Sequence, residues 1–143
     1  MRDDFRAQTI RNLAARVGYH CSNPSCMRST SGPALAEEGT VNIGVGAHIA
    51  AAAPGGKRYD PNMSSAERSS PMNGIWMCQS CSKLIDSDDS RFTVALLQEW
   101  KDTAIQRALG AIAGGEQLGS IRPAELLDDA DQDFLRVLNL TTV

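Results

Sequence analysis

Apolar positions in the first forty-five residues predict one helix followed by one strand. The helix is expected where apolar residues recur at helical spacing, at Ile10, Leu13, Ala14 and Val17. Asp3 or Asp4 is positioned to cap its start, and Gly18 to end it. Residues 19–33 are rich in turn formers and predict a tight loop. Beyond this loop, the alternation of Val41, Ile43 and Val45 predicts a strand that runs toward His48.

From Ser64 onward, the pattern predicts more helix than strand. Ser64 with Glu67 has the spacing of a capping box and predicts a single helical turn. Asn73 to Met77 reads as a second short strand, and a helix is expected to begin near Cys78 or Cys81. The longest helix should be capped by Thr93 and end at Gly114 and Gly115. Its apolar face is predicted at Leu97, Trp100, Ala104, Ala108 and Ile112.

Composition and charge divide the 143 residues into two unequal parts. Residues 1–110 carry twelve basic and eleven acidic side chains, whereas residues 111–143 carry two arginines against six acids, a net charge of −4. The predicted domains are therefore a domain with flanking helices at 1–112, then a linker and an acidic amphipathic helix at 113–143. This last segment is expected to dock onto a partner protein or to begin a further sensor or effector domain. Hydrophobic residues make up 42 % of the chain, which excludes disorder throughout.

No apolar run reaches the roughly 20 residues of a membrane-spanning helix, and the N-terminus lacks the hydrophobic stretch of a secretory signal. The predicted location is the cytoplasm, with no membrane partner. Thiols are reduced there, which bears on the four cysteines. Aromatic residues are only 5 % of the chain, so the core is expected to be small and to need further stabilisation.

The cysteines form two short pairs, Cys21-x4-Cys26 and Cys78-x2-Cys81, separated by about fifty residues. Each pair has the spacing of a knuckle that turns two sulfurs toward one point, and four thiolates complete a tetrahedron around Zn²⁺. Two disulfides or four free thiols are the alternatives. A reducing compartment disfavours disulfides, and free thiols need no paired spacing. The sequence therefore predicts a structural zinc site, which would add on the order of 10 kcal/mol to folding.

A second candidate site centres on His48, at the end of a predicted strand and before a glycine-rich loop with Lys57 and Arg58. A neutral imidazole can act as a general base near pH 7. Asn73 precedes the second knuckle and Asp86 follows it on the next helix. Each residue also has a purely structural interpretation: a core histidine, a solvated basic pair, a turn asparagine, and a helix-end or capping aspartate.

The segments HCSNPSC, VGAHI and NGIWMCQSCSKLID together resemble the HNH endonucleases in their zinc-containing form, over residues 21 to about 100. More narrowly, VNIGVGAHI, APGGKRYDP and LLQEWK resemble an N-terminal module of bacterial defence and effector proteins. The resemblance implies an α+β fold: a small ββα-metal core stapled by a four-cysteine zinc site and flanked by an N-terminal helix and a long C-terminal helix.

The resemblance also implies hydrolysis of phosphodiester bonds in DNA, most readily double-stranded, in antiphage defence. His48 would be the general base, Asn73 would position it, and a catalytic Mg²⁺ or Mn²⁺ would lie beside it. Lys57 and Arg58 would bind neighbouring phosphates. Two positions depart from the family, since Ala47 and Ser82 stand where metal ligands are common.

Asp86 offers a substitute for the second missing ligand, because it lies four residues after Ser82 on a predicted helix and shares its face. Three interpretations remain open: an active metal-dependent endonuclease, a DNA-binding module on the same scaffold without turnover, and a zinc-stapled protein-interaction domain. The sequence does not determine the base specificity, DNA against RNA, the regulator of cleavage or whether the chain forms a homo-oligomer.

Overall fold

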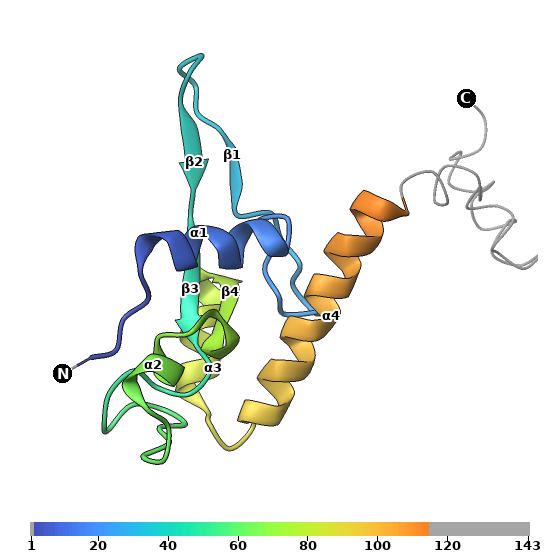
Figure 1. Cartoon of the computed structure of the whole chain (residues 1–143). Coiled ribbons are helices and arrows are strands. Elements are labelled where there is room, and N and C mark those ends of the chain that lie inside the picture. Colours follow the sequence, from blue (N-terminus) through green and yellow to red (C-terminus); the bar gives the residue numbers. More distant parts are fainter. Residues whose placement is uncertain (1, 115–143) are drawn as a thin grey trace, which may run out of the picture. The chain divides into compact units, whose positions relative to one another are not determined.

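The computed structural model describes residues 2–114. The chain divides into two compact units, Met1–Leu109 and Gly110–Val143. The first unit is a small α+β structure with two separate two-stranded sheets (Figure 1). The predicted acidic helix lies wholly outside the described residues, which include only the first two positions of the segment 113–143, so that part of the predicted domain division stays a prediction.

The first unit is organised around the antiparallel pair of β3 (Gly44–His48) and β4 (Gly74–Cys78), in which His48 stands opposite Gly74 and Gly44 opposite Cys78. Both strands contact α1 (Ala7–Arg16), and both also contact α3 (Gln79–Ser87), which follows β4 directly. The order β3, β4, α3 thus provides two antiparallel strands and a helix, with the second cysteine pair at the junction of strand and helix.

Alternation along β4 separates two cores. Trp76 packs with Leu13, Ala14 and Val17 of α1 in one cluster, whereas Ile75 and Met77 pack with the cysteines and Ile85 of α3 in the other. Successive strand residues point to opposite faces, so a two-stranded sheet can be buried on both. β4 is buried at all five positions, and this is why it reads as a continuous apolar run.

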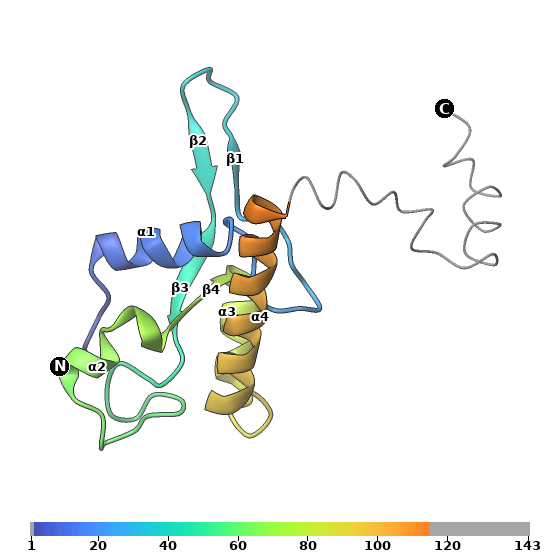
Figure 2. The ribbon, with the colours of Figure 1, turned by 45° about the vertical axis from the view of Figure 1, so that its right-hand side comes forward.

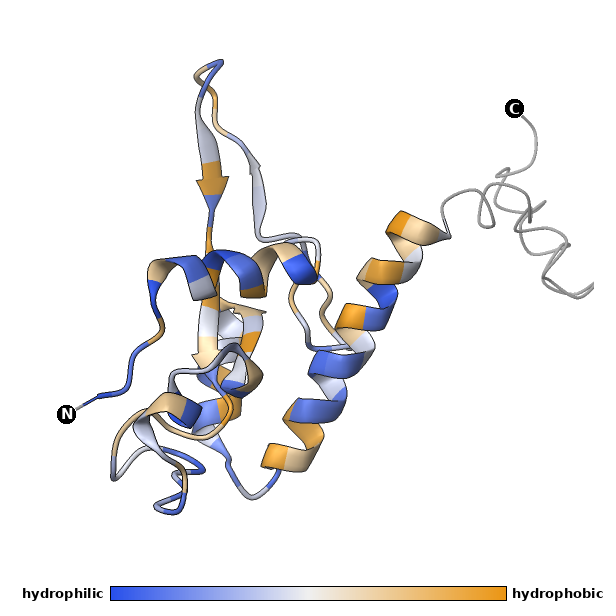
Figure 3. Ribbon diagram, viewed as in Figure 1, coloured by the Kyte–Doolittle hydropathy of each residue, from blue (hydrophilic) through white to orange (hydrophobic). Residues whose placement is uncertain are grey.

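The helix boundaries agree closely with the sequence pattern in the second half of the chain. Ser64 and Glu67 form a complete capping box before α2 (Ser65–Arg68). The Thr93 hydroxyl accepts from the Leu96 amide at 3.2 Å, and α4 runs over Val94–Ala113. Figure 3 shows hydrophilic and hydrophobic residues alternating along α4, and Leu97 and Ala104 are its buried positions. A 3-10 turn, η1 (Pro71–Asn73), leads into β4.

The strand predicted through Val41 and Val45 is two strands. β2 (Thr40–Asn42) pairs with β1 (Ser31–Pro33), and these form a hairpin that projects from the rest of the unit (Figures 1 and 2). The break has a local cause, because the Asn42 side chain accepts from the Gly44 amide at 3.1 Å and turns the backbone. A Cβ at Gly44 would lie 2.0 Å from the Trp76 ring, so only glycine fits there.

The predicted cap of the first helix is wrong. Arg6 occupies the cap position of α1 and makes no side-chain hydrogen bond. The Asp3 amide instead donates to the Ala52 carbonyl at 3.0 Å, and the Asp3 carboxylate accepts from Arg68 at 3.4 Å. Residues 2–6 therefore form an extended N-terminal strap that is tied to the loop after β3. Because Asp3 makes these long-range contacts, its side chain does not cap α1, although aspartate is a favoured cap residue.

Candidate functional site

The four cysteines converge on one point. Their sulfur atoms all lie within 4.8 Å of one another, and none forms a disulfide. Four thiolates around Zn²⁺ at about 2.3 Å stand about 3.8 Å apart. The 3.9 Å between the Cys26 and Cys78 sulfurs is close to that spacing. The cluster could therefore hold a metal ion such as zinc, as the spacing of the cysteines predicted.

Two backbone turns shape the cluster. In the first, the Asn23 carbonyl accepts from the amides of Cys26 and Met27, and Met27 adopts a left-handed conformation with φ of 56°. In the second, the Cys78 sulfur accepts from the Cys81 amide at 3.4 Å at the start of α3. Donors to sulfur stabilise thiolate charge and orient the ligand. Both cysteine pairs are therefore preformed by local hydrogen bonds.

Asn23 is a supporting residue that the sequence analysis missed. It is buried, and its side-chain amide donates to the Cys81 sulfur at 3.4 Å while its side-chain oxygen accepts from the Ser25 amide. An asparagine directly before a proline in a cysteine turn was the available signal. Burial raises the pKa of the Cys21 thiol to about 12, so a thiolate at that position needs a nearby cation.

His48 stands at the end of β3 with one ring nitrogen engaged. Its Nε2 lies 2.9 Å from the Asp3 carbonyl oxygen, and its ring stacks on Phe5 with centroids 3.9 Å apart. A carbonyl oxygen only accepts, so Nε2 carries the proton and the neutral ring has its lone pair on Nδ1. Burial lowers the pKa of His48 from about 6.5, although the Asp3 carbonyl opposes the shift. His48 is therefore neutral at pH 7, the form that can accept a proton.

Asn73 holds the backbone just beyond His48. Its side-chain oxygen accepts from the Ala50 amide, and its side-chain nitrogen donates to the carbonyls of Ala50 and Arg68, all within 2.9–3.0 Å. Its own carbonyl also accepts from the Ile49 amide at 2.8 Å. Asn73 is buried, and it contacts the chain that follows β3 rather than the His48 ring. Asn73 therefore supports the backbone directly after β3, and its expected role in positioning the His48 ring stays a prediction.

Asp86 and Arg58 form an ion pair at 2.9 Å. The Arg58 side chain is only 4 % exposed, and it also donates to the carbonyls of Ile49, Ile85 and Phe92. Arg58 thus fastens the glycine-rich loop to the end of α3, and its donors face protein rather than solvent. Asp86 is 58 % exposed, so one side of its carboxylate is accessible to a ligand.

A cavity of about 250 Å³ brings the candidate residues together. His48, Lys57, Ser82 and Asp86 all line it, with Ala47 and Arg2 at its wall. Arg58 and Asn73 do not line it and act through the backbone behind it. The cavity therefore combines one imidazole, one carboxylate and two cationic side chains, at the edge of β3 and beside α3.

The N-terminal strap is the part of this site that the sequence analysis did not find. Asp3 and Phe5 fix the tautomer and the plane of His48 from more than forty positions away in the chain. No local pattern links such distant positions, so nothing in the sequence could have pointed to them. Arg2 reaches the same cavity as a consequence of this strap.

The comparisons with known proteins assign no family. No protein-family model matches the chain, and no curated protein matches it significantly in sequence. Among the described helices, none combines the length and apolar character needed to cross a bilayer.

Proposed function

We propose that this chain is a metal-dependent endonuclease module of the HNH kind, which hydrolyses phosphodiester bonds in DNA. The observation that carries the proposal is His48, whose Nε2–H is committed to the Asp3 carbonyl and whose Nδ1 keeps a lone pair. His48 lines the same cavity as Asp86 and Lys57. A base, a carboxylate for a hard cation and a cation for phosphate are the parts that this chemistry requires.

In the proposed reaction, Nδ1 of His48 takes a proton from a water molecule that attacks the phosphorus, the bond from phosphorus to the 3′ oxygen breaks, and this oxygen takes a proton from solvent water. The stack on Phe5 and the bond to Asp3 hold the ring, so proton transfer needs no reorientation of the imidazole. Lys57 contacts a neighbouring phosphate oxygen. Asp86 would hold Mg²⁺ or Mn²⁺, and the cation would neutralise charge on the scissile phosphate and its leaving oxygen.

The cysteine cluster has a structural part in this proposal. A closed set of four sulfur ligands suits Zn²⁺ and leaves no position for a substrate. Cys78 caps α3, the helix that carries Asp86, so a zinc ion there would fix the helix relative to β4. The proposed zinc is therefore spatially separate from the proposed catalytic cation.

A DNA-binding module without turnover is the second candidate. The ion pair between Asp86 and Arg58 favours it, because the lone carboxylate of the cavity already has a cationic partner. Ala47 adds no ligand, and Ser82 is a weak one. Such a module would keep the basic wall of the cavity and bind phosphates without cutting.

The two candidates are separated by a nicking assay on supercoiled plasmid with Mg²⁺ or Mn²⁺, with EDTA as the negative control. We expect His48→Ala to lower the rate by about 10²–10⁴-fold, which is the usual contribution of a general base. The matched control is His20→Ala, which changes the only other histidine of the chain, at the start of the first cysteine turn. Both variants are checked for native circular dichroism before assay.

Retained DNA binding without cleavage under either metal would establish the second candidate. Equal loss of activity in both histidine variants would remove His48 from the proposed base role. Cleavage that persists in EDTA would exclude the metal-dependent mechanism.

A further inference from the structure

A larger cavity lies apart from the His48 site. It has a volume of about 730 Å³ and is formed by α4, by the segment from Asp60 to Asn73 that includes α2 and η1, and by the end of α1. This volume lies within the range of about 300–1,000 Å³ typical of small-molecule pockets. It shares no lining residue with the cavity that contains His48 and Asp86.

The walls of the larger cavity are aliphatic. Met63, Met72, Val94 and Ile105 line it, and no aromatic side chain does. Met72 is 78 % exposed and Val94 44 % exposed, so an occupant would remove apolar surface from water. Methionine side chains adapt to different shapes, and the lack of an aromatic ring removes the usual platform for a nucleobase. The walls therefore suit an aliphatic body.

One end of this cavity is cationic. Arg16 and Lys101 both line it, and neither forms an ion pair within residues 2–114. The Lys101 ammonium donates to the Pro71 carbonyl, and burial together with the Arg16 charge lowers its pKa to about 8. Asp102 is the one acidic neighbour that favours the charged form of Lys101, and it is exposed to solvent. An anion between the two cations would relieve their repulsion.

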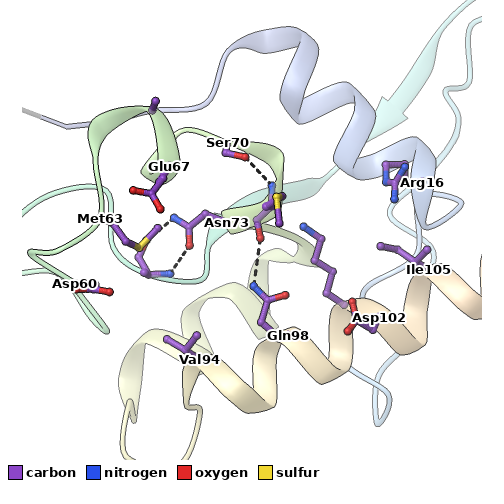
Figure 4. Close-up of a pocket in the computed structure, with 14 residues that line it drawn as sticks. Arg16, Asp60, Met63, Glu67, Ser70, Asn73, Val94, Gln98, Asp102 and Ile105 are labelled. Atoms are coloured by element: carbon purple, nitrogen blue, oxygen red, sulfur yellow. Dashed lines mark hydrogen bonds between the residues drawn. The ribbon is translucent and has the colours of Figure 1, made fainter.

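The other end of the cavity carries Asp60 and Glu67. Figure 4 shows these two side chains with Met63 on one side of the pocket, and Arg16, Asp102 and Ile105 on the other. The Asp60 carboxylate already accepts from the Asn62 amide, and Glu67 belongs to the capping box of α2. These acids have partners, whereas Arg16 has none among the described residues, so the cavity favours a ligand whose anionic group lies at the Arg16 end.

We propose that this cavity is a binding site for a small amphipathic anion, with an aliphatic body against Met72 and Val94 and a carboxylate or phosphate group between Arg16 and Lys101. The site extends beyond the proposed nuclease function and does not depend on it. Asn73 lines this cavity with its amide bound to Ala50, so an occupant touches a residue that supports the backbone after His48.

The test is a titration of the full chain followed by ¹H–¹⁵N correlation spectra. Octanoate and octyl phosphate are the probes, and octanol and octylammonium are the controls of equal chain length. We expect saturable shifts at Met72, Val94 and Lys101, with both anions bound at least about tenfold more tightly than octanol or octylammonium. The tighter of the two anions identifies the headgroup class.

Charge variants test the orientation of the ligand. Lys101→Met and Arg16→Gln should each weaken binding of the preferred anion by about fivefold or more, and Asp102→Asn should strengthen it. Comparable affinity for octanol and the anions would overturn the proposal, as would tighter binding of octylammonium. Shifts that map outside the cavity, or no saturable shift with any probe, would overturn it too. None of these measurements involves DNA cleavage, so their failure is distinct from failure of the nuclease proposal.

Discussion

The cysteine cluster and the His48 cavity are built in opposite ways. In the cluster, four ligands of one kind converge from two short turns, and local hydrogen bonds preform each turn. In the cavity, each functional group comes from a different part of the chain: the N-terminal strap, β3, the glycine-rich loop and α3. The cluster is thus closed and built from four equivalent ligands, whereas the cavity is open and has a single carboxylate.

This difference predicts where each site is vulnerable. Loss of one sulfur removes a quarter of a closed coordination shell and leaves buried polar atoms without a partner. Loss of one group in the cavity leaves the remaining scaffold intact, because Arg58 and Asn73 hold the backbone from behind it. The cluster should therefore control folding, and the cavity should control chemistry.

The largest expected effect comes from the cluster. Cys81→Ser, or removal of metal by a strong chelator, should unfold the first unit, since a structural zinc site contributes on the order of 10 kcal/mol. Far-ultraviolet circular dichroism and metal content by mass spectrometry measure the outcome. Ser80→Ala, at an exposed position in the same turn, is the matched control. A Cys81→Ser protein that keeps the native spectrum and melting temperature would show that the cluster is not a structural metal site.

The next largest effect is expected at Asn73, which supports the backbone that follows His48. Asn73→Ala removes three side-chain hydrogen bonds and leaves buried partners on Ala50 and Arg68. The free energy of unfolding should fall by about 3 kcal/mol, measured by urea denaturation. Asn62→Ala, in an exposed turn, is the control and should change it little. A loss below about 0.5 kcal/mol would mean that the loop after β3 has other support.

The contrast between the locally built cluster and the cavity built from distant segments also explains what the sequence could predict. Cysteine spacing, the Ser64 capping box and the Thr93 cap are local patterns, and the structure confirms the convergence of the four cysteines and both caps. The β1–β2 hairpin was missed, because β1 (Ser31–Pro33) consists of residues typical of turns and β2 (Thr40–Asn42) continued the alternation of β3 in one predicted strand. The contacts of the strap residues Asp3 and Phe5 with His48 span more than forty positions, so they arise from tertiary packing and have no local signature.

A smaller effect is expected from the pH dependence of His48. Its pKa is lowered by burial, so the imidazole is neutral above about 6.5 and the nicking rate should rise with pH to a plateau by pH 7. The same shift makes folding less favourable as pH falls below about 6.5, because the unfolded chain then binds the proton more readily. Titration of the imidazole by NMR gives the pKa directly and does not require activity.

Phe5→Leu tests whether burial against the Phe5 ring lowers the pKa of His48. A smaller side chain against the ring admits water, so the pKa of His48 should move up toward its ordinary value. Phe92→Leu is the control, because Phe92 lies in the other core cluster and its loss should lower stability without moving the pKa of His48. A pKa of His48 above about 6.5 in the wild-type chain would contradict the role of burial.

The smallest effect on stability is expected at Asp86. A change there should alter the chemistry of the His48 cavity while leaving the fold almost unchanged. Asp86 is 58 % exposed, and Arg58 keeps three carbonyl partners without it. Asp86→Asn should therefore change the free energy of unfolding by about 0.5 kcal/mol, because solvent screens the exposed carboxylate, while the Mn²⁺ concentration needed for half-maximal nicking rises. Asp89→Asn, exposed in the turn after α3, is the control for charge alone. A stability loss of about 2 kcal/mol or more, with unchanged metal dependence, would instead make Asp86 a structural partner of Arg58 and favour the module without turnover.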